Sequence, residues 1–82
     1  MNYALITGGS SGIGLAFAKQ LALRSYNLIL VSNREEENVK VSQELFLDFQ
    51  VDIRYFTIDL AHPQAAQQTF IFCQNNNLYV EV

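Results

Sequence analysis

The chain has 82 residues, 50% of them hydrophobic and 16% charged, and its net charge is −3 at pH 7. This balance predicts one compact domain, because disordered chains have fewer apolar residues and collagen-like chains have far more glycine and proline. A chain of this length has no room for a second, substrate-binding domain. Its five basic residues are scattered along the sequence, so we expect no nucleic-acid partner.

The cysteine content and the hydropathy of the chain exclude further classes of protein. The single cysteine, Cys73, excludes an internal disulfide and a multi-cysteine zinc site, and we expect no metal. No apolar run approaches the length of a membrane span, and the first residues lack the basic and apolar regions of a signal peptide. We therefore expect no membrane partner and a cytoplasmic location.

Two continuous apolar runs, each followed by a helical pattern, occupy the first part of the chain. Residues 3–6 and 28–31 lack polar alternation, which predicts strands buried on both faces. A helix from the glycine-rich turn to about residue 24 is predicted by apolar residues at helical spacing, namely Ile13, Phe17 and Leu21. A second helix, residues 35–49, is predicted by three glutamates in its first turn and by apolar residues four apart, namely Val41, Leu45 and Phe49.

The rest of the chain predicts an edge strand, a helix and a further strand. Between Val51 and Ile58, charged residues alternate with apolar ones, which is typical of a strand with one solvated face. A helix is expected to begin at Pro63, where the missing N–H costs nothing, and to end at asparagines 75–77. Residues 78–82 predict a fourth strand. The buried face of the third helix is expected to hold Ala66, Phe70 and Cys73.

Strands that alternate with helices predict an α/β fold with a parallel sheet, right-handed crossovers and helices on both faces. The βαβαβαβ order corresponds to a single, partial Rossmann domain over residues 1–82, with sheet order 3-2-1-4 and with the chain ending inside the fourth strand. This order places the two continuous strands inside the sheet and the alternating third strand at its edge.

The segment from Thr7 to Gly14 reads TGGSSGIG and lies between a predicted strand and a predicted helix. Such a turn directs backbone N–H groups and the positive end of a helix dipole at one point, which favours an anion such as a pyrophosphate. A Walker P-loop is excluded because no Gly-Lys-Ser/Thr follows. The alternative is a glycine-rich turn that binds nothing. The residues expected to hold the phosphates are Gly8, Ser10, Ser11, Gly12, Ile13 and Gly14, the last by letting the helix pack closely.

The sequence TGGSSGIG resembles the cofactor-binding signature of the short-chain dehydrogenase/reductase family, and the resemblance extends through the whole chain. Asp59 and Leu60 follow the third predicted strand and match the family's Asp-Leu/Val pair. The resemblance implies that the Asp59 side chain contacts the adenine amino group and that the Leu60 backbone lines the adenine pocket. The alternative for Asp59 is a carboxylate that makes a local backbone hydrogen bond. Ser25 stands where the family usually has a glycine.

The end of the second predicted strand indicates which cofactor is used. An NAD-binding fold carries an acidic residue there, which accepts a hydrogen bond from the ribose 2′-hydroxyl. Here the position reads Ser32, Asn33 and Arg34, and a guanidinium can bind a 2′-phosphate bidentately while small polar neighbours add hydrogen bonds. This resembles NADP-preferring members, so we expect NADP(H). The alternative is that Arg34 is a solvated cation neutralised by the glutamates at 35–37.

The family's chemistry is hydride transfer between a nicotinamide and a carbonyl or hydroxyl carbon, with a catalytic tyrosine, a lysine four residues later and a serine. None of the four tyrosines here is followed by such a lysine, so we assign no catalytic residue. We expect the N-terminal part of an NADP(H)-dependent oxidoreductase, which binds the adenosine and pyrophosphate half of the cofactor and is inactive alone. An open edge of the fourth strand predicts self-association. The alternatives are a non-catalytic nucleotide-binding module and a self-associating structural fragment.

Overall fold

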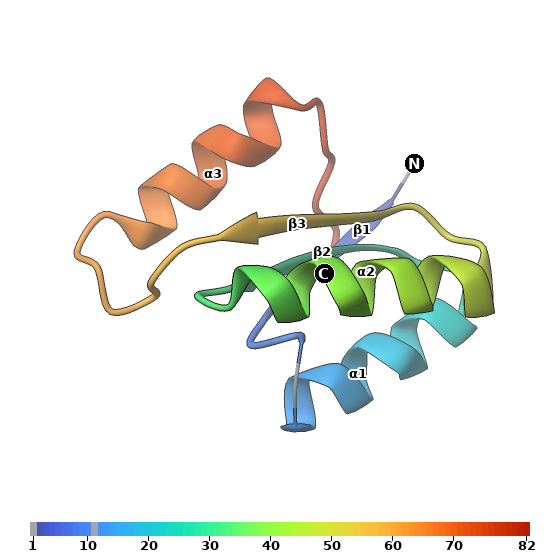
Figure 1. Ribbon diagram of the computed structural model, residues 1–82. Coiled ribbons are helices and arrows are strands. Elements are labelled where there is room, and N and C mark those ends of the chain that lie inside the picture. The colour runs from blue at the N-terminus through green and yellow to red at the C-terminus, as the bar shows by residue number, and fades with distance from the viewer. Residues whose placement is uncertain (1, 11) are drawn as a thin grey trace.

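The computed structural model describes residues 2–10 and 12–82, and these form an α/β structure with three parallel strands and three helices (Figure 1). The chain is a partial Rossmann fold, as the alternation of strands and helices predicted. The elements in chain order are β1 (Tyr3–Thr7), α1 (Gly12–Leu23), β2 (Asn27–Ser32), α2 (Glu35–Phe49), β3 (Ile53–Thr57) and α3 (Ala65–Asn75).

The sheet has the order β1-β2-β3, with β2 in the middle. Residues 3–7 of β1 pair with 27–31, and residues 28–32 of β2 pair with 53–57. The four apolar side chains of β2, residues 28–31, are completely buried, which confirms the prediction from their continuous run. Among the described strands β3 lies at the edge, and its exposed Arg54 marks the solvated face that the alternating pattern predicted.

The segment after α3 returns to the free edge of β1. Val80 forms a parallel bridge with Tyr3, and the Leu5 N–H donates to the Val82 carbonyl at 2.8 Å. The Glu81 N–H donates to the Tyr3 carbonyl at 2.9 Å. Because β2 occupies the other edge of β1, residues 78–82 lie where a fourth strand was expected. They pair through one bridge rather than along a regular strand.

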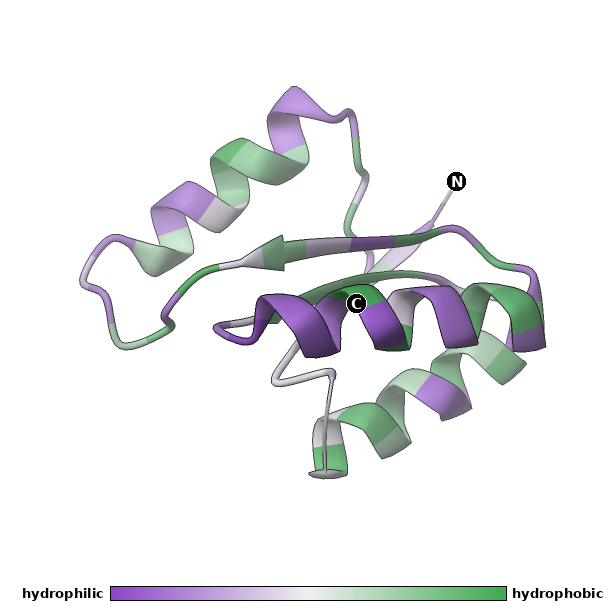
Figure 2. Ribbon diagram, viewed as in Figure 1, coloured by the Kyte–Doolittle hydropathy of each residue, from purple (hydrophilic) through white to green (hydrophobic). Residues whose placement is uncertain are grey.

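The helices form two layers that cover opposite faces of the sheet (Figure 1). On one face, Ala4, Ile6, Leu28 and Leu30 pack with the buried residues of α1 and α2. On the other face, Tyr3, Ile29 and Val31 pack with Cys73 and Leu78, which lie at the end of α3 and just after it. Figure 2 shows β2 as a hydrophobic strand between these layers and the first turn of α2 as hydrophilic. No helix of the described residues is long and apolar enough to cross a membrane.

The buried face of α1 differs from the predicted apolar stripe. Ile13 is 78% and Phe17 62% exposed, whereas Ala18 and Ala22 are buried against the sheet. The reason is steric, because small residues allow α1 to lie closer to the strands than large side chains would. Ile13 and Phe17 therefore project from the flank of α1, whereas Leu21, the third residue of the stripe, is partly buried against the core.

The buried face of α3 is also displaced from the predicted one. Ala66 and Phe70 are exposed, and the residues that are buried are Ala65, Thr69 and Cys73. The helix begins at Ala65, two residues after Pro63, because the preceding turn continues through residue 64. Cys73 is buried as predicted, and its burial raises the pKa of the thiol.

Each of the three helices is followed, within two residues, by a non-glycine residue with a left-handed backbone. Their φ angles are 68° at Ser25, 56° at Gln50 and 56° at Asn77. After α1, the Tyr26 N–H donates to the Leu21 carbonyl at 3.0 Å and the Ser25 N–H donates to the Ala22 carbonyl at 2.9 Å. This pattern is a Schellman motif, and glycine is its preferred residue at the position of Ser25.

We predict that Ser25→Gly raises the free energy of unfolding by about 0.5–1 kcal/mol, because it relieves the left-handed strain by more than it adds unfolded-state entropy. The measurement is urea denaturation followed by circular dichroism. Ser25→Ala is the matched control, because it keeps the Cβ and should give no gain. A lower stability of Ser25→Gly would contradict the assignment of strain to this turn.

At the amino edge of the sheet, a buried hydroxyl bonds to an ion pair. The Tyr3 hydroxyl donates to the carboxylate of Asp52, which also pairs with Arg54 at 3.0 Å. The Asp52 N–H donates to the side chain of Asn27 at 2.9 Å. Burial, together with the Asp52 carboxylate, raises the pKa of Tyr3 above its ordinary value, and the same carboxylate raises the pKa of Arg54.

A raised pKa for Tyr3 predicts a pH-dependent stability. The folded state holds this proton more tightly than the unfolded state, so its contribution is present below about pH 10 and is lost as the pH rises through the folded pKa. Tyr3→Phe should therefore show a smaller fall in unfolding free energy between neutral and strongly alkaline pH. Tyr79→Phe is the control because Tyr79 is 68% exposed, and it should follow the unaltered chain.

Candidate functional site

The turn between β1 and α1 has the backbone that its glycines predicted. Gly8 has a φ of 67° and Gly12 a φ of 58°, both in the region that favours glycine. A Cβ placed on either residue would meet no atom within 4 Å, so the space in front of the turn is open. The Gly8 N–H donates to the Val31 carbonyl at 2.8 Å, which fixes the start of the turn to β2.

Gly14 allows the first turn of α1 to touch the backbone of this turn. A Cβ at Gly14 would lie 2.0 Å from the Gly8 carbonyl oxygen and 3.1 Å from the Gly9 Cα. Gly9 is also confined, because its Cβ would lie 2.8 Å from Leu30 Cδ2. Gly9 was not among the predicted site residues, and its confinement concerns the packing of the turn against β2.

A groove with both polar and apolar lining runs beside the turn along the flank of α1. Its volume is about 500 Å³, and its lining comes from β1, the glycine turn and the exposed face of the helix. Ile13 and Gly14 are the predicted site residues within it, together with Gly8. Ser11, also predicted for the phosphate site, lies outside the described residues. The other lining residues are Leu5, Ile6, Thr7, Phe17 and Leu21.

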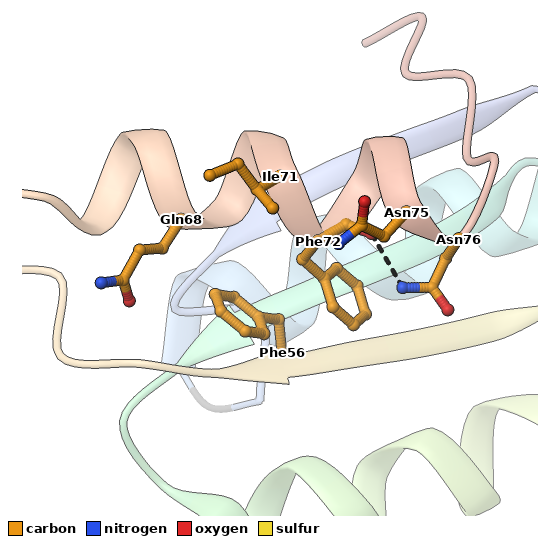
Figure 3. A pocket seen from close by; sticks show the side chains of 6 residues that line it. All are labelled: Phe56, Gln68, Ile71, Phe72, Asn75 and Asn76. Atoms are coloured by element: carbon orange, nitrogen blue, oxygen red, sulfur yellow. Dashed lines mark hydrogen bonds between the residues drawn. The ribbon is translucent and has the colours of Figure 1, made fainter.

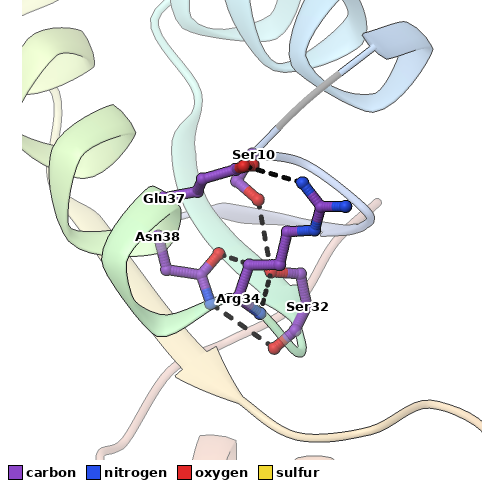
Figure 4. Close-up of polar contacts among 5 residues, drawn as sticks. All are labelled: Ser10, Ser32, Arg34, Glu37 and Asn38. Atoms are coloured by element: carbon purple, nitrogen blue, oxygen red, sulfur yellow. Dashed lines mark hydrogen bonds and ion pairs between the residues drawn. The ribbon is translucent and has the colours of Figure 1, made fainter.

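The end of β2 is joined to the glycine turn by buried hydroxyls (Figure 4). Ser10 Oγ and Ser32 Oγ lie 3.2 Å apart, and both residues are buried. Ser32 Oγ donates to Asn38 Oδ1 at 2.8 Å and accepts from the Arg34 N–H at 3.3 Å. Asn33 is exposed at the turn that follows. The structure thus brings Ser10 and Ser32 together inside the protein and leaves Arg34 at the surface.

Arg34 is the residue before α2, and its side chain is 64% exposed. Its Nη1 donates to Glu37 Oε1 at 2.8 Å, so the neutralising carboxylate foreseen as an alternative is present. Glu35 turns the other way and accepts hydrogen bonds from Thr57 and, at 3.4 Å, from Tyr55 on β3. One of the three glutamates therefore pairs with Arg34, and one is engaged with the edge strand.

Asp59 and Leu60 follow β3 at the same edge of the sheet. The Ile58 N–H donates to the Ser32 carbonyl at 2.9 Å, which holds this loop beside the end of β2. Both residues are exposed. Asp59 Oδ1 accepts from the Ala61 N–H at 2.9 Å, which is the local bond considered as its alternative role. The carboxyl ends of β1, β2 and β3 therefore gather the described residues of the predicted site at one edge.

A second groove, of about 300 Å³, lies on the opposite face between β3 and α3 (Figure 3). Phe56 and Phe72 stack there with ring centroids 4.7 Å apart. The remaining lining residues, Gln68, Ile71, Asn75 and Asn76, include no titratable side chain. The described residues also contain no cluster of three His, Cys, Asp or Glu side chains that could bind a metal ion.

Comparison with known proteins identifies the family. The family model described as short chain dehydrogenase matches residues 2–82. The chain belongs to this family. A very-long-chain 3-oxoacyl-CoA reductase of Kluyveromyces lactis is 39% identical over 69 residues, which are 84% of this chain and 20% of the reductase. The chain thus spans about a fifth of that relative's length.

Two solved structures of similar proteins share its fold. A short-chain dehydrogenase from Sphingobium yanoikuyae in complex with NADPH has a TM-score of 0.83 and 26% identity, over 96% of this chain and 31% of that one. L-sorbose reductase from Gluconobacter frateurii, complexed with NADPH and L-sorbose, has a TM-score of 0.84 and 29% identity, over 89% and 28%. The chain therefore has a Rossmann-type fold and corresponds to part of the length of proteins in an oxidoreductase family.

Two polar residues at the site were missed by the sequence analysis. Asn38 is fully buried and bonds to Ser32, and Glu37 pairs with Arg34. In the sequence, Asn38 lies three residues before Val41 and seven before Leu45, on the apolar face of the predicted helix. This position could have indicated that Asn38 is buried. Glu37 was seen only as one of three equivalent glutamates.

We predict that Gly14→Ala lowers the free energy of unfolding by at least about 2 kcal/mol, because its Cβ would overlap the backbone of the turn. Gly8→Ala meets no atom, and its left-handed backbone should cost only about 1–2 kcal/mol. Thermal denaturation of the two variants beside the unaltered chain tests this order. Equal stability of Gly14→Ala and the unaltered chain would show that α1 can move away from the turn.

Proposed function

We propose that this chain binds the adenosine and pyrophosphate half of NADP(H) within an oxidoreductase that transfers hydride between the nicotinamide and a carbonyl or hydroxyl carbon. The observation that carries the proposal is the surface-exposed Arg34 beside an open glycine turn, with the two held together through Ser10 and Ser32. When bound, the cofactor supplies the hydride chemistry through its nicotinamide.

The pyrophosphate fits the open side of the turn. Gly8 and Gly12 leave the backbone without a Cβ, and α1 begins at Gly12. The positive end of the helix dipole and the N–H groups of its first turn then face an anion without a competing side chain. Ile13, in the first turn of α1, would contribute to this site through its backbone.

The 2′-phosphate of NADP(H) fits Arg34. A guanidinium carries five N–H donors, and Glu37 accepts from Nη1, so other donors can reach a phosphate. The end of β2 has Ser32 and Asn33 rather than an acidic residue. This position therefore lacks the carboxylate that would accept a hydrogen bond from the 2′-hydroxyl of an unphosphorylated ribose. The NADPH complexes of the similar dehydrogenase and of the similar L-sorbose reductase agree with this choice. Asp59 and Leu60, at the same edge, are proposed to line the adenine pocket.

The proton chemistry is proposed to come from residues other than these 82. Tyr3, Tyr26 and Tyr55 are followed four positions later by Thr7, Leu30 and Asp59 rather than by a lysine. We therefore propose that the chain alone binds nucleotide without turning over a carbonyl substrate. Self-association through the outer edge of residues 78–82 stays a prediction.

Calorimetry with two nucleotides tests the cofactor proposal. Adenosine 2′,5′-bisphosphate carries the 2′-phosphate, and adenosine 5′-monophosphate lacks it. The unaltered chain should bind the bisphosphate more tightly, and Arg34→Gln should weaken that binding about tenfold with little change for the monophosphate, because it removes a charge-assisted contact.

Arg24→Gln is the matched control, because Arg24 is an exposed arginine at the far end of α1. It removes the same charge away from the site and should leave both affinities unchanged. Equal affinity of the unaltered chain for the two nucleotides would remove the role of Arg34, and no binding of either would refute the nucleotide site.

A further inference from the structure

Asn38 is a buried polar residue on the sheet-facing side of α2. Its exposed fraction is zero, and the following turns of the same face contribute Val41 and Leu45 to the core. A buried amide destabilises a protein unless its donors and acceptor are satisfied. Here Oδ1 accepts from Ser32 Oγ at 2.8 Å, and Nδ2 donates to Thr57 Oγ1 at 3.2 Å and to the Ser32 carbonyl at 3.4 Å.

The direction of these hydrogen bonds follows from the Glu35 carboxylate, which lies at one end of the series. The Glu35 carboxylate only accepts, so Thr57 donates its hydroxyl hydrogen to it. Thr57 Oγ1 therefore accepts from the Asn38 amide, and this sets Oδ1 of Asn38 towards Ser32. Ser32 donates its only hydroxyl hydrogen to Asn38, so Ser10 must be the donor in the 3.2 Å contact between the two serines.

Ser32 Oγ is the junction between the two halves of the site (Figure 4). Its lone pairs accept from Ser10 in the glycine turn and from the Arg34 N–H at the start of α2. Both contacts require the Ser32 hydroxyl hydrogen to point away from them, towards Asn38. The orientation of one buried amide thus determines that Ser32 Oγ accepts hydrogen bonds from both the glycine turn and the Arg34 backbone.

We propose that Asn38 is a positioning residue for selection of the 2′-phosphate. This inference rests on the proposed function, and it extends that function to a residue that touches no ligand. Without the amide, the Ser32 hydroxyl would rotate and the restraint between the turn and Arg34 would loosen. A nucleotide without a 2′-phosphate uses the turn but not Arg34, so its affinity depends less on this restraint.

The test is the ratio of the dissociation constant of adenosine 5′-monophosphate to that of adenosine 2′,5′-bisphosphate. Asn38→Leu keeps the volume and removes the amide, and it should lower this ratio about five- to tenfold, the effect of losing one hydrogen-bonded restraint. If Asn38 had a purely structural role, Asn38→Leu would weaken the binding of both nucleotides equally and leave the ratio unchanged. Circular dichroism establishes that each variant is folded.

Ser42→Ala is the matched control. Ser42 is buried one turn further along the same face of α2, and its hydroxyl has no hydrogen-bond partner among the described residues. Removing it changes a buried polar group of α2 without touching the chain of hydrogen bonds, so the ratio should stay at the value of the unaltered chain.

A second variant covers the case in which Asn38→Leu does not fold. Thr57→Val removes the acceptor of the Asn38 amide from β3 and should lower the ratio in the same direction. An unchanged ratio in whichever of these two variants is folded overturns the inference, provided that the unaltered chain prefers the bisphosphate. A ratio near one for the unaltered chain instead overturns the proposed function.

Discussion

The contact between Gly14 and the Gly8 carbonyl is the constraint on which the arrangement of this chain depends. At Gly14 the first turn of α1 lies directly against the backbone of Gly8 and Gly9, with no room for a Cβ between them. This closeness explains why α1 meets the sheet through Ala18 and Ala22. It also brings the amino end of the helix beside the open face of Gly8, where an anion gains most from the helix dipole.

The elements and their order were predictable because their signals are local. The continuous apolar run at residues 28–31 indicated a strand covered on both faces, and the glycine turn indicated where α1 starts. Helical spacing singled out Phe17 and Phe70, which are exposed, whereas Cys73 on the same predicted face as Phe70 is buried. Close packing on a sheet selects small side chains instead, and spacing alone does not carry that information.

The candidate site was predictable to the extent that its chemistry resides in a motif. TGGSSGIG and Arg34 are visible in the sequence, and the carboxyl edge of the sheet gathers them. The bonds of Asn38 could not be read in advance, because they join β2, α2 and β3 and depend on the register between Ser32 and Thr57. The choice of Glu37 rather than Glu35 as partner of Arg34 likewise depends on which glutamate faces β3.

The Tyr3–Asp52–Arg54 cluster and the candidate site lie at opposite ends of the strands. The cluster ties the amino edge of the sheet together, at the opposite end from the glycine turn, Arg34 and Asp59. Substitutions at the proposed nucleotide-binding edge are therefore expected to leave the polar contacts of Tyr3, Asp52 and Arg54 at the other edge intact. Such a separation allows the binding edge to diversify in evolution while the sheet keeps its register, because effects at distant sites are nearly additive.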